Sequence, residues 1–174
     1  MNHLEQLVRE WLTYRGYLVQ GPVLVGPRKS GGYEGELDVL GLNLATCHFV
    51  HVECSLDALS WDQREVRFAG KFERGRRFAR AHFPFAPTDL PLDQVALLHF
   101  ASPSDRRIGG ARLVTGRAFV QEILAGLDGT SSATLAVPSH LPLIRTLQLA
   151  KEAYAGQPGR SASIIPDEAT ASPR

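Results

Sequence analysis

The stretch Glu36–Ser55 reads ELDVLGLNLATCHFVHVECS and holds two apolar segments joined by a short connection. Val, Leu and Phe dominate both segments, which is typical of β-strands. The connection around Ala45-Thr46 has the length of a β-hairpin turn. The spacing therefore predicts two antiparallel strands, Glu36–Leu44 and His48–Ser55.

A two-residue turn at this place fixes which residues of the two strands face each other. Leu40 then pairs with His51, and Asp38 with Glu53. Directly paired side chains have Cβ atoms about 5 Å apart, and two carboxylates at that spacing repel each other. We expect a positive charge between them, and oxygen ligands of this kind suit Mg²⁺ or Mn²⁺. Asp38 and Glu53 are thus the predicted metal ligands.

The segments on either side predict further helices and strands. Apolar residues recur at helical spacing from Leu4 up to Gly16, and again on one face of Leu59–Ala81. The remaining predicted elements are an interrupted strand Tyr17–Val25, a loop Gly26–Gly35, strands Gln94–Phe100 and Arg112–Thr115, a helix Arg117–Leu127, and a helix Ser139–Tyr154 with Ser139 as N-cap. This order predicts an α/β fold in which helices flank a central mixed β-sheet.

The chain has 174 residues, the size of one domain, and we expect a single domain over residues 1–155. Residues 156–174 are rich in Gly, Pro, Ser and Ala, which predicts a flexible tail. No apolar run is long enough to span a membrane, and the first residues lack a signal-peptide pattern. Cys47 and Cys54 lie too close on one hairpin for a disulfide framework, so we expect a reducing, cytoplasmic setting.

Two motifs on the predicted strands resemble a known superfamily. Gly35–Gly41 (GELDVLG) and Val50–Ser55 (VHVECS) are similar to the core of the PD-(D/E)XK, or restriction-endonuclease-like, nucleases. The resemblance covers roughly residues 4–100 and implies a restriction-endonuclease-like core. Asp38 and Glu53 match the two acidic strand positions that bind Mg²⁺ in that superfamily.

The sequence departs from the superfamily pattern at Ser55, where the motif has a lysine. Some members resemble this chain in drawing the basic residue from the helix that follows, and Lys71 is the only lysine on that predicted helix. The resemblance therefore implies that Lys71 is the catalytic cation. Gln63 and Arg67 lie on the same helix and could share the role, although arginine stays charged and is a poor proton acceptor.

An acidic residue from the first helix often assists in this superfamily. Glu5 flanks the apolar stripe of the first helix and can reach the edge of the sheet, whereas Glu10 points away from it toward solvent. Glu5 is therefore a further candidate catalytic residue. The alternative is a surface Glu5 that pairs with Arg9 at i,i+4.

The net charge of the chain is +1, but seven basic residues face only three acidic ones between Trp61 and Arg80. Arg64, Arg67 and Arg74 are spaced for one helix face, which predicts contacts with the phosphates of a nucleic acid. A solvated helix face is the alternative. Glu36 shares a strand face with Asp38 and is either a further ligand or a sheet-edge charge.

Four side chains on the hairpin resemble a zinc cluster in composition: Cys47, His48, His51 and Cys54. Strand alternation divides them between two faces of the sheet, so a zinc site is not expected.

The leading hypothesis is a nuclease that depends on Mg²⁺ or Mn²⁺ and hydrolyses phosphodiester bonds of nucleic acid, with DNA as the favoured substrate. The competing hypothesis is an inactive nuclease-like domain that binds nucleic acid or another protein, and Ser55 is its main support. A homodimer or a larger assembly is compatible with either hypothesis.

Overall fold

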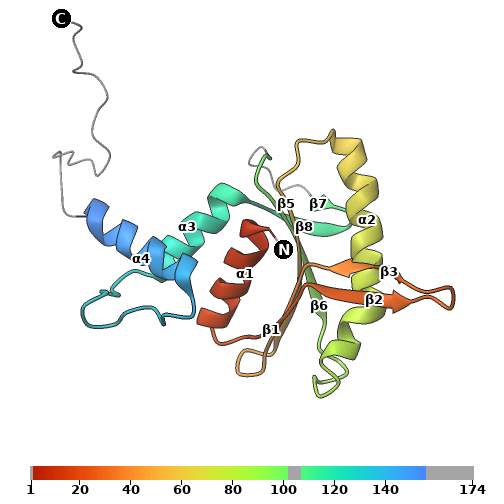
Figure 1. Ribbon diagram of the computed structural model, residues 1–174, viewed down its shortest axis with the longest axis horizontal. Helices are drawn as coiled ribbons and strands as arrows, with labels where there is room; N and C mark the ends of the chain where they lie inside the picture. Colours follow the sequence, from red (N-terminus) through yellow and green to blue (C-terminus); the bar gives the residue numbers. More distant parts are fainter. Residues whose placement is uncertain (1, 102–106, 156–174) are drawn as a thin grey trace, which may run out of the picture.

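The computed structural model describes residues 2–101 and 107–155, so the predicted tail at 156–174 lies outside the described residues. Figure 1 shows a sheet with helices on both of its faces. In chain order the elements are α1 (His3–Tyr14), β1 (Leu18–Gln20), β2 (Val23–Pro27), β3 (Tyr33–Leu37), β4 (Val39–Asn43), β5 (His48–Ser55), α2 (Trp61–Phe78), a 3-10 turn η1 (Ala79–His82), β6 (Leu92–Leu98), β7 (Arg107–Ile108), β8 (Ala111–Thr115), α3 (Gly116–Gly126) and α4 (Pro142–Ala155).

The main sheet has six strands in the order β1-β4-β5-β6-β8-β7. Strand β6 runs parallel to β5 and β8, whereas the other pairs are antiparallel. Helices α1, α3 and α4 lie on one face of this sheet and α2 lies on the other (Figure 1). The predicted α/β class, with a mixed sheet flanked by helices, is confirmed.

Alternation along β5 decides which side chains meet which helix. Val50, Val52 and Cys54 belong to the apolar core that contains α1, α3 and α4. The intervening residues, His51 and Glu53, therefore point to the opposite face, where α2 packs. Both are completely buried there. A polar pair thus lies beneath α2, inside the protein.

The predicted register of β4 and β5 is confirmed over Val39–Asn43, where Leu40 pairs with His51, but the predicted pair Asp38–Glu53 is not part of the ladder. The predicted strand Glu36–Leu44 is wrong in one respect, since the chain bends at Asp38 and leaves the main sheet. The residues before Asp38 form β3, which pairs with β2 in a separate two-stranded sheet. Part of the predicted loop Gly26–Gly35 is therefore strand. The bend sets the Asp38 side chain at the junction of the two sheets.

Two predictions are wrong at the contact between Glu10 of α1 and the start of α4. It is 5% exposed, although the sequence placed it toward solvent. Its Oε2 accepts hydrogen bonds from the backbone N–H groups of Leu143 (2.7 Å) and Ile144 (3.1 Å) in the first turn of α4. The helix begins at Pro142, so Ser139 is not its N-cap. A carboxylate from α1 satisfies these otherwise unpaired donors and interacts favourably with the helix dipole.

Helix α2 begins after Ser60, whose Oγ accepts a hydrogen bond from the backbone N–H of Gln63. The Gln63 side chain accepts one in return from the backbone N–H of Ser60, which completes a capping box. Within the described residues, no helix has both the length and the apolar character needed to cross a bilayer.

Candidate functional site

Asp38, Glu53 and Lys71 form one hydrogen-bonded cluster between the sheet and α2. The Lys71 Nζ atom lies 3.1 Å from each carboxylate oxygen of Asp38 and also donates to Glu53 Oε2. The structure therefore brings together the two strand carboxylates and the helix lysine named from the sequence. The positive charge between the acids is the Lys71 ammonium.

The cluster is buried, which sets its electrostatics. Asp38 is 5% exposed and Glu53 is fully buried. Burial, and then the charge of Glu53, raises the pKa of Asp38 to about 7, although Lys71 and the backbone N–H of Cys54 act in the opposite direction. One ammonium thus faces two buried acids and can neutralise the charge of only one of them. The raised pKa of Asp38 reflects this shortage of positive charge.

Glu53 and Lys71 are held in their charged forms. Burial acts to raise the pKa of Glu53, but the hydrogen bond from His51, together with the charge and hydrogen bond of Lys71, outweighs it and the pKa is lowered. Burial acts to lower the pKa of Lys71, but the charges of Glu53 and Asp38 outweigh it and the pKa is raised. Glu53 is therefore a carboxylate and Lys71 an ammonium at neutral pH.

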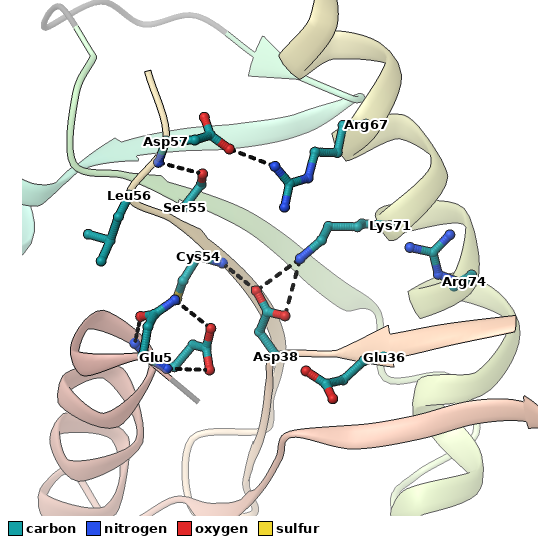
Figure 2. A pocket seen from close by; sticks show the side chains of 11 residues that line it. Glu5, Glu36, Asp38, Cys54, Ser55, Leu56, Asp57, Arg67, Lys71 and Arg74 are labelled. Atoms are coloured by element: carbon teal, nitrogen blue, oxygen red, sulfur yellow. Dashed lines mark hydrogen bonds and ion pairs between the residues drawn. The ribbon is translucent and has the colours of Figure 1, made fainter. Parts of the chain in front are cut away.

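A cleft of about 420 Å³ opens beside this cluster (Figure 2). Its wall is mostly polar and comes from the start of α1, the end of β3, the end of β5 and α2. The lining residues are Asn2, Glu5, Glu36, Asp38, Cys54, Ser55, Leu56, Asp57, Arg67, Lys71 and Arg74. Asp38 and Lys71 reach the cleft, whereas Glu53 is covered and is not part of the wall.

Glu5 lies at this cleft, as its position on the first helix predicts. It is 8% exposed, which is inconsistent with the alternative that Glu5 is a surface residue. Its carboxylate accepts hydrogen bonds from the backbone N–H (3.0 Å) and the side-chain amide (2.6 Å) of Asn2, in the capping box of α1. Glu5 therefore has a structural partner at the edge of the site.

Of the three arginines predicted to contact phosphates, Arg64 does not face the cleft. It is 6% exposed, and it donates to Asp57 and to the backbone oxygen of Phe100. Arg64 shares a helix face with Phe68 and Phe72, at i+4 and i+8, and that face is buried. Arg64 therefore ties α2 to the loops at the end of the sheet, and the prediction of a phosphate contact there is corrected.

Arg67 and Arg74 extend from α2 at the cleft, on either side of Lys71 (Figure 2). Arg67 Nη1 donates to Asp57 Oδ2 at 2.7 Å. Arg74 packs against the backbone of β3, where a Cβ on Gly35 would come within 2.9 Å of Arg74 Cδ. The Nε atom of Arg74 is buried and has no hydrogen-bond partner. Two of the three predicted arginines thus present cations to the cleft.

Asp57 was not identified from the sequence. Burial acts to raise its pKa, but hydrogen bonds from Ser55, Leu59 and Arg64 outweigh this effect and the pKa is lowered. Its place just after the β5 motif and before an arginine-bearing helix was a usable signal. Asp57 holds two α2 arginines against the end of β5.

His51 was also missed, because the sequence placed it only in a rejected zinc cluster. Its Nε2 atom lies 2.7 Å from Glu53 Oε1. The i,i+2 spacing on one strand was a signal for this contact. Cys47 is exposed on the turn and Cys54 is buried in the sheet. Among residues 2–101 and 107–155, no group of three or more His, Cys, Asp or Glu side chains is arranged to hold a metal ion.

The fold and the cleft define an α/β protein with a mixed six-stranded sheet and a buried acid–lysine cluster. Comparison of the chain with protein-family models, with curated proteins and with solved structures gives no match.

Proposed function

We propose that the protein is a metal-dependent nuclease with a restriction-endonuclease-like core that hydrolyses phosphodiester bonds, with DNA as the first substrate to test. The observation that carries this proposal is the convergence of Asp38, Glu53 and Lys71 beside an arginine-bearing cleft. The three residues come from the junction before β4, from β5 and from the following helix. This is the arrangement implied by the resemblance to PD-(D/E)XK nucleases.

The chemistry of the donor set fits Mg²⁺ or Mn²⁺. Asp38 and Glu53 offer carboxylate oxygens, and one ammonium leaves the pair with excess negative charge. The adjoining cleft is polar and large enough for the waters that Mg²⁺ retains. Asp38 and Glu53 would hold the ion, which supplies Lewis acidity and lowers the pKa of bound water.

The cations of the chain bind and orient the substrate. Arg67 and Arg74 lie on either side of Lys71 along α2, so both are placed to contact phosphates of a bound strand. Lys71 stabilises negative charge that develops on the attacked phosphate. Asp57 restrains Arg67 and thereby limits the directions in which this guanidinium points.

A second candidate function is a nuclease-like domain without catalysis that binds nucleic acid or a protein. Two observations favour it. Ser55 stands at the motif position of the lysine. Glu53 is fully covered, with Lys71 bonded to Oε2 and His51 to Oε1, so a metal ion reaches it only if Lys71 gives up this contact.

A cleavage assay separates the two candidates. Purified protein is incubated with single-stranded, duplex and branched DNA and with RNA, in Mg²⁺ and in Mn²⁺. We expect metal-dependent cleavage that falls at least 100-fold in Asp38→Ala, because one of two acidic ligands is lost. Asp93→Asn is the matched control, since Asp93 lies outside the cleft, and it keeps full activity.

The variant Ser55→Lys tests whether the protein is inactive because the motif lysine is missing. Position 55 is two residues beyond Glu53 on the same strand face, so the new ammonium enters beside the acids. A wild type that cuts none of these substrates, together with a Ser55→Lys variant that does, refutes the nuclease and supports the second candidate.

A further inference from the structure

His51 makes a single directed contact with the acid cluster from inside the protein. The ring is completely buried on β5, and its Nε2 atom lies 2.7 Å from Glu53 Oε1. Glu53 Oε2 is bonded to Lys71. The two oxygens of one carboxylate are therefore assigned to different donors, one in the core and one at the cleft.

Gln94 on β6 determines which nitrogen of His51 carries the proton. The Gln94 Nε2 atom lies 2.8 Å from the backbone oxygen of Phe72, and a carbonyl only accepts. The Gln94 Oε1 atom in turn accepts from Arg76 Nη1 at 3.0 Å. Both contacts fix the orientation of the amide.

The Gln94 Nε2 atom also lies 3.2 Å from His51 Nδ1, so the second N–H of the amide is available to this ring nitrogen. Since the amide is a donor there, Nδ1 is an acceptor, and the ring proton resides on Nε2. That proton is donated to Glu53. The result is a fixed chain in which Gln94, anchored on the Phe72 backbone oxygen of α2, donates to His51, and His51 donates to Glu53.

Helix α2 leaves room for this chain at one position. A Cβ added at Gly75 would overlap His51 Nδ1 and come within 2.8 Å of Gln94 Nε2. Glycine inside a helix is less favourable than alanine, because it loses more backbone conformational entropy on folding. The helix therefore accepts an unfavourable residue where it crosses the His51–Gln94 pair.

We propose that His51, held as its Nε2–H form by Gln94, is a positioning residue that fixes Glu53 Oε1 in the core and directs Oε2 toward Lys71 and the cleft. The effect of His51 on the binding of a divalent ion rests on the proposed function, in which Glu53 is a metal ligand. Hydrogen-bond partners behind a metal ligand typically contribute 10- to 100-fold to metal affinity.

Titration with Mn²⁺, followed by electron paramagnetic resonance, tests this role. His51→Leu removes the donor and is expected to weaken Mn²⁺ binding at least tenfold. His51→Gln restores an N–H at the position of Nε2, and we expect its affinity to stay within threefold of the wild type. His48→Gln, on the same strand but outside the cluster, is the matched control and leaves the affinity unchanged.

The rescue by glutamine distinguishes positioning from packing. Both replacements change the shape of a buried side chain, but only leucine removes the donor to Glu53. Equal weakening in both variants would therefore overturn the proposal. An unaltered Mn²⁺ affinity in His51→Leu would overturn it as well. In that case, a loss of Mn²⁺ binding in Asp38→Ala would still support the metal site and the proposed function.

A second measurement needs neither metal nor activity. Long-range ¹H–¹⁵N correlation spectra report which ring nitrogen of His51 carries the proton, and the His51→Gln spectrum assigns the signals. We expect the Nε2–H form in the wild type and a growing share of the Nδ1–H form in Gln94→Leu. A wild-type ring protonated on Nδ1 alone would refute the positioning chain. If Mn²⁺ fails to bind the wild type, the proposed function loses its metal site, and this spectrum still decides the role of His51.

Discussion

Strand β5 carries a polar cluster at each end, and the two clusters differ in burial and in charge balance. The inner cluster consists of His51, Glu53, Lys71 and Asp38. The outer cluster consists of Tyr17, His48, Asp93 and Arg112, where Tyr17 Oη lies 2.6 Å from His48 Nδ1 and Arg112 Nη2 lies 2.9 Å from Asp93 Oδ2. Each cluster joins a helix or loop to the sheet.

The outer cluster is the ordinary arrangement for a partly exposed surface. The side chains of Asp93 and Arg112 are 32% and 51% exposed, and one acid faces one arginine. Burial acts to raise the pKa of Asp93, but Arg112 outweighs it and the pKa is lowered. The inner cluster instead keeps two acids on one lysine inside the protein, and one acid has a raised pKa. Such a surplus costs stability, and strongly perturbed acids are concentrated at functional sites.

Removing the cation gives the largest expected difference between the clusters. Lys71→Met leaves two buried acids without a counter-charge, and we expect the free energy of unfolding at pH 8 to fall by about 3–5 kcal/mol. Arg112→Met in the outer cluster is expected to cost less than about 1 kcal/mol, because the pair is exposed and screened. Urea denaturation measures both. Equal losses in the two variants would contradict the difference between the clusters.

Neutralising one acid is expected to change the free energy of unfolding in opposite directions in the two clusters. The pKa of Asp38 is raised from 3.8 to about 7, so ionised Asp38 destabilises the fold fully above pH 7, and the cost disappears as the pH falls toward 3.8. Asp38→Asn is therefore expected to stabilise the protein at pH 8 by at most about 4 kcal/mol, and by little at pH 4.

Asp93→Asn is expected to lower the free energy of unfolding. Its folded-state pKa is lowered, so ionised Asp93 contributes stability above pH 3.8, which is lost as the pH falls through the folded-state value. We expect a loss of less than about 1 kcal/mol at pH 8. Thermal or urea unfolding at both pH values checks the pair of variants, and a destabilised Asp38→Asn at pH 8 would rule out the raised pKa.

The last comparison concerns two glycines of α2, only one of which adjoins the inner cluster. Gly75→Ala places a methyl group against His51 and Gln94, and we expect a loss of about 1–3 kcal/mol. Gly70→Ala meets only Arg74 Nη1 at 3.7 Å, an ordinary contact, and should gain about 0.5–1 kcal/mol from helix propensity. A gain in both variants would show that α2 does not pack tightly on His51.

The sequence was sufficient for the parts of the fold that depend on local spacing. The β4–β5 register follows from the turn, and it correctly placed Asp38 near Glu53, since both acids contact Lys71 Nζ. The break of the strand at Asp38 was not predicted, because it depends on the pairing of β3 with β2 and not on the composition of the strand. Lys71 was found through the resemblance, while its bonds to both acids required the packing of α2.

Residues that act through distant partners were missed or misplaced. The role of His51 depends on Gln94, which is 43 positions away in the sequence. Glu10 reaches α4 across a separation of 133 residues, so helical periodicity alone placed it in solvent. Arg64 is different, since its spacing from Phe68 and Phe72 marked a buried face that the clustering of arginines obscured.

The bond from Glu10 to α4 also sets an order of events during synthesis. At a translation rate of about 5–20 residues per second, Leu143 follows Glu10 from the ribosome after on the order of ten seconds. Until then, the Glu10 carboxylate lacks the backbone donors of α4 that it contacts in the folded protein. The contact between α1 and α4 therefore forms only after the last described helix, α4, has been made.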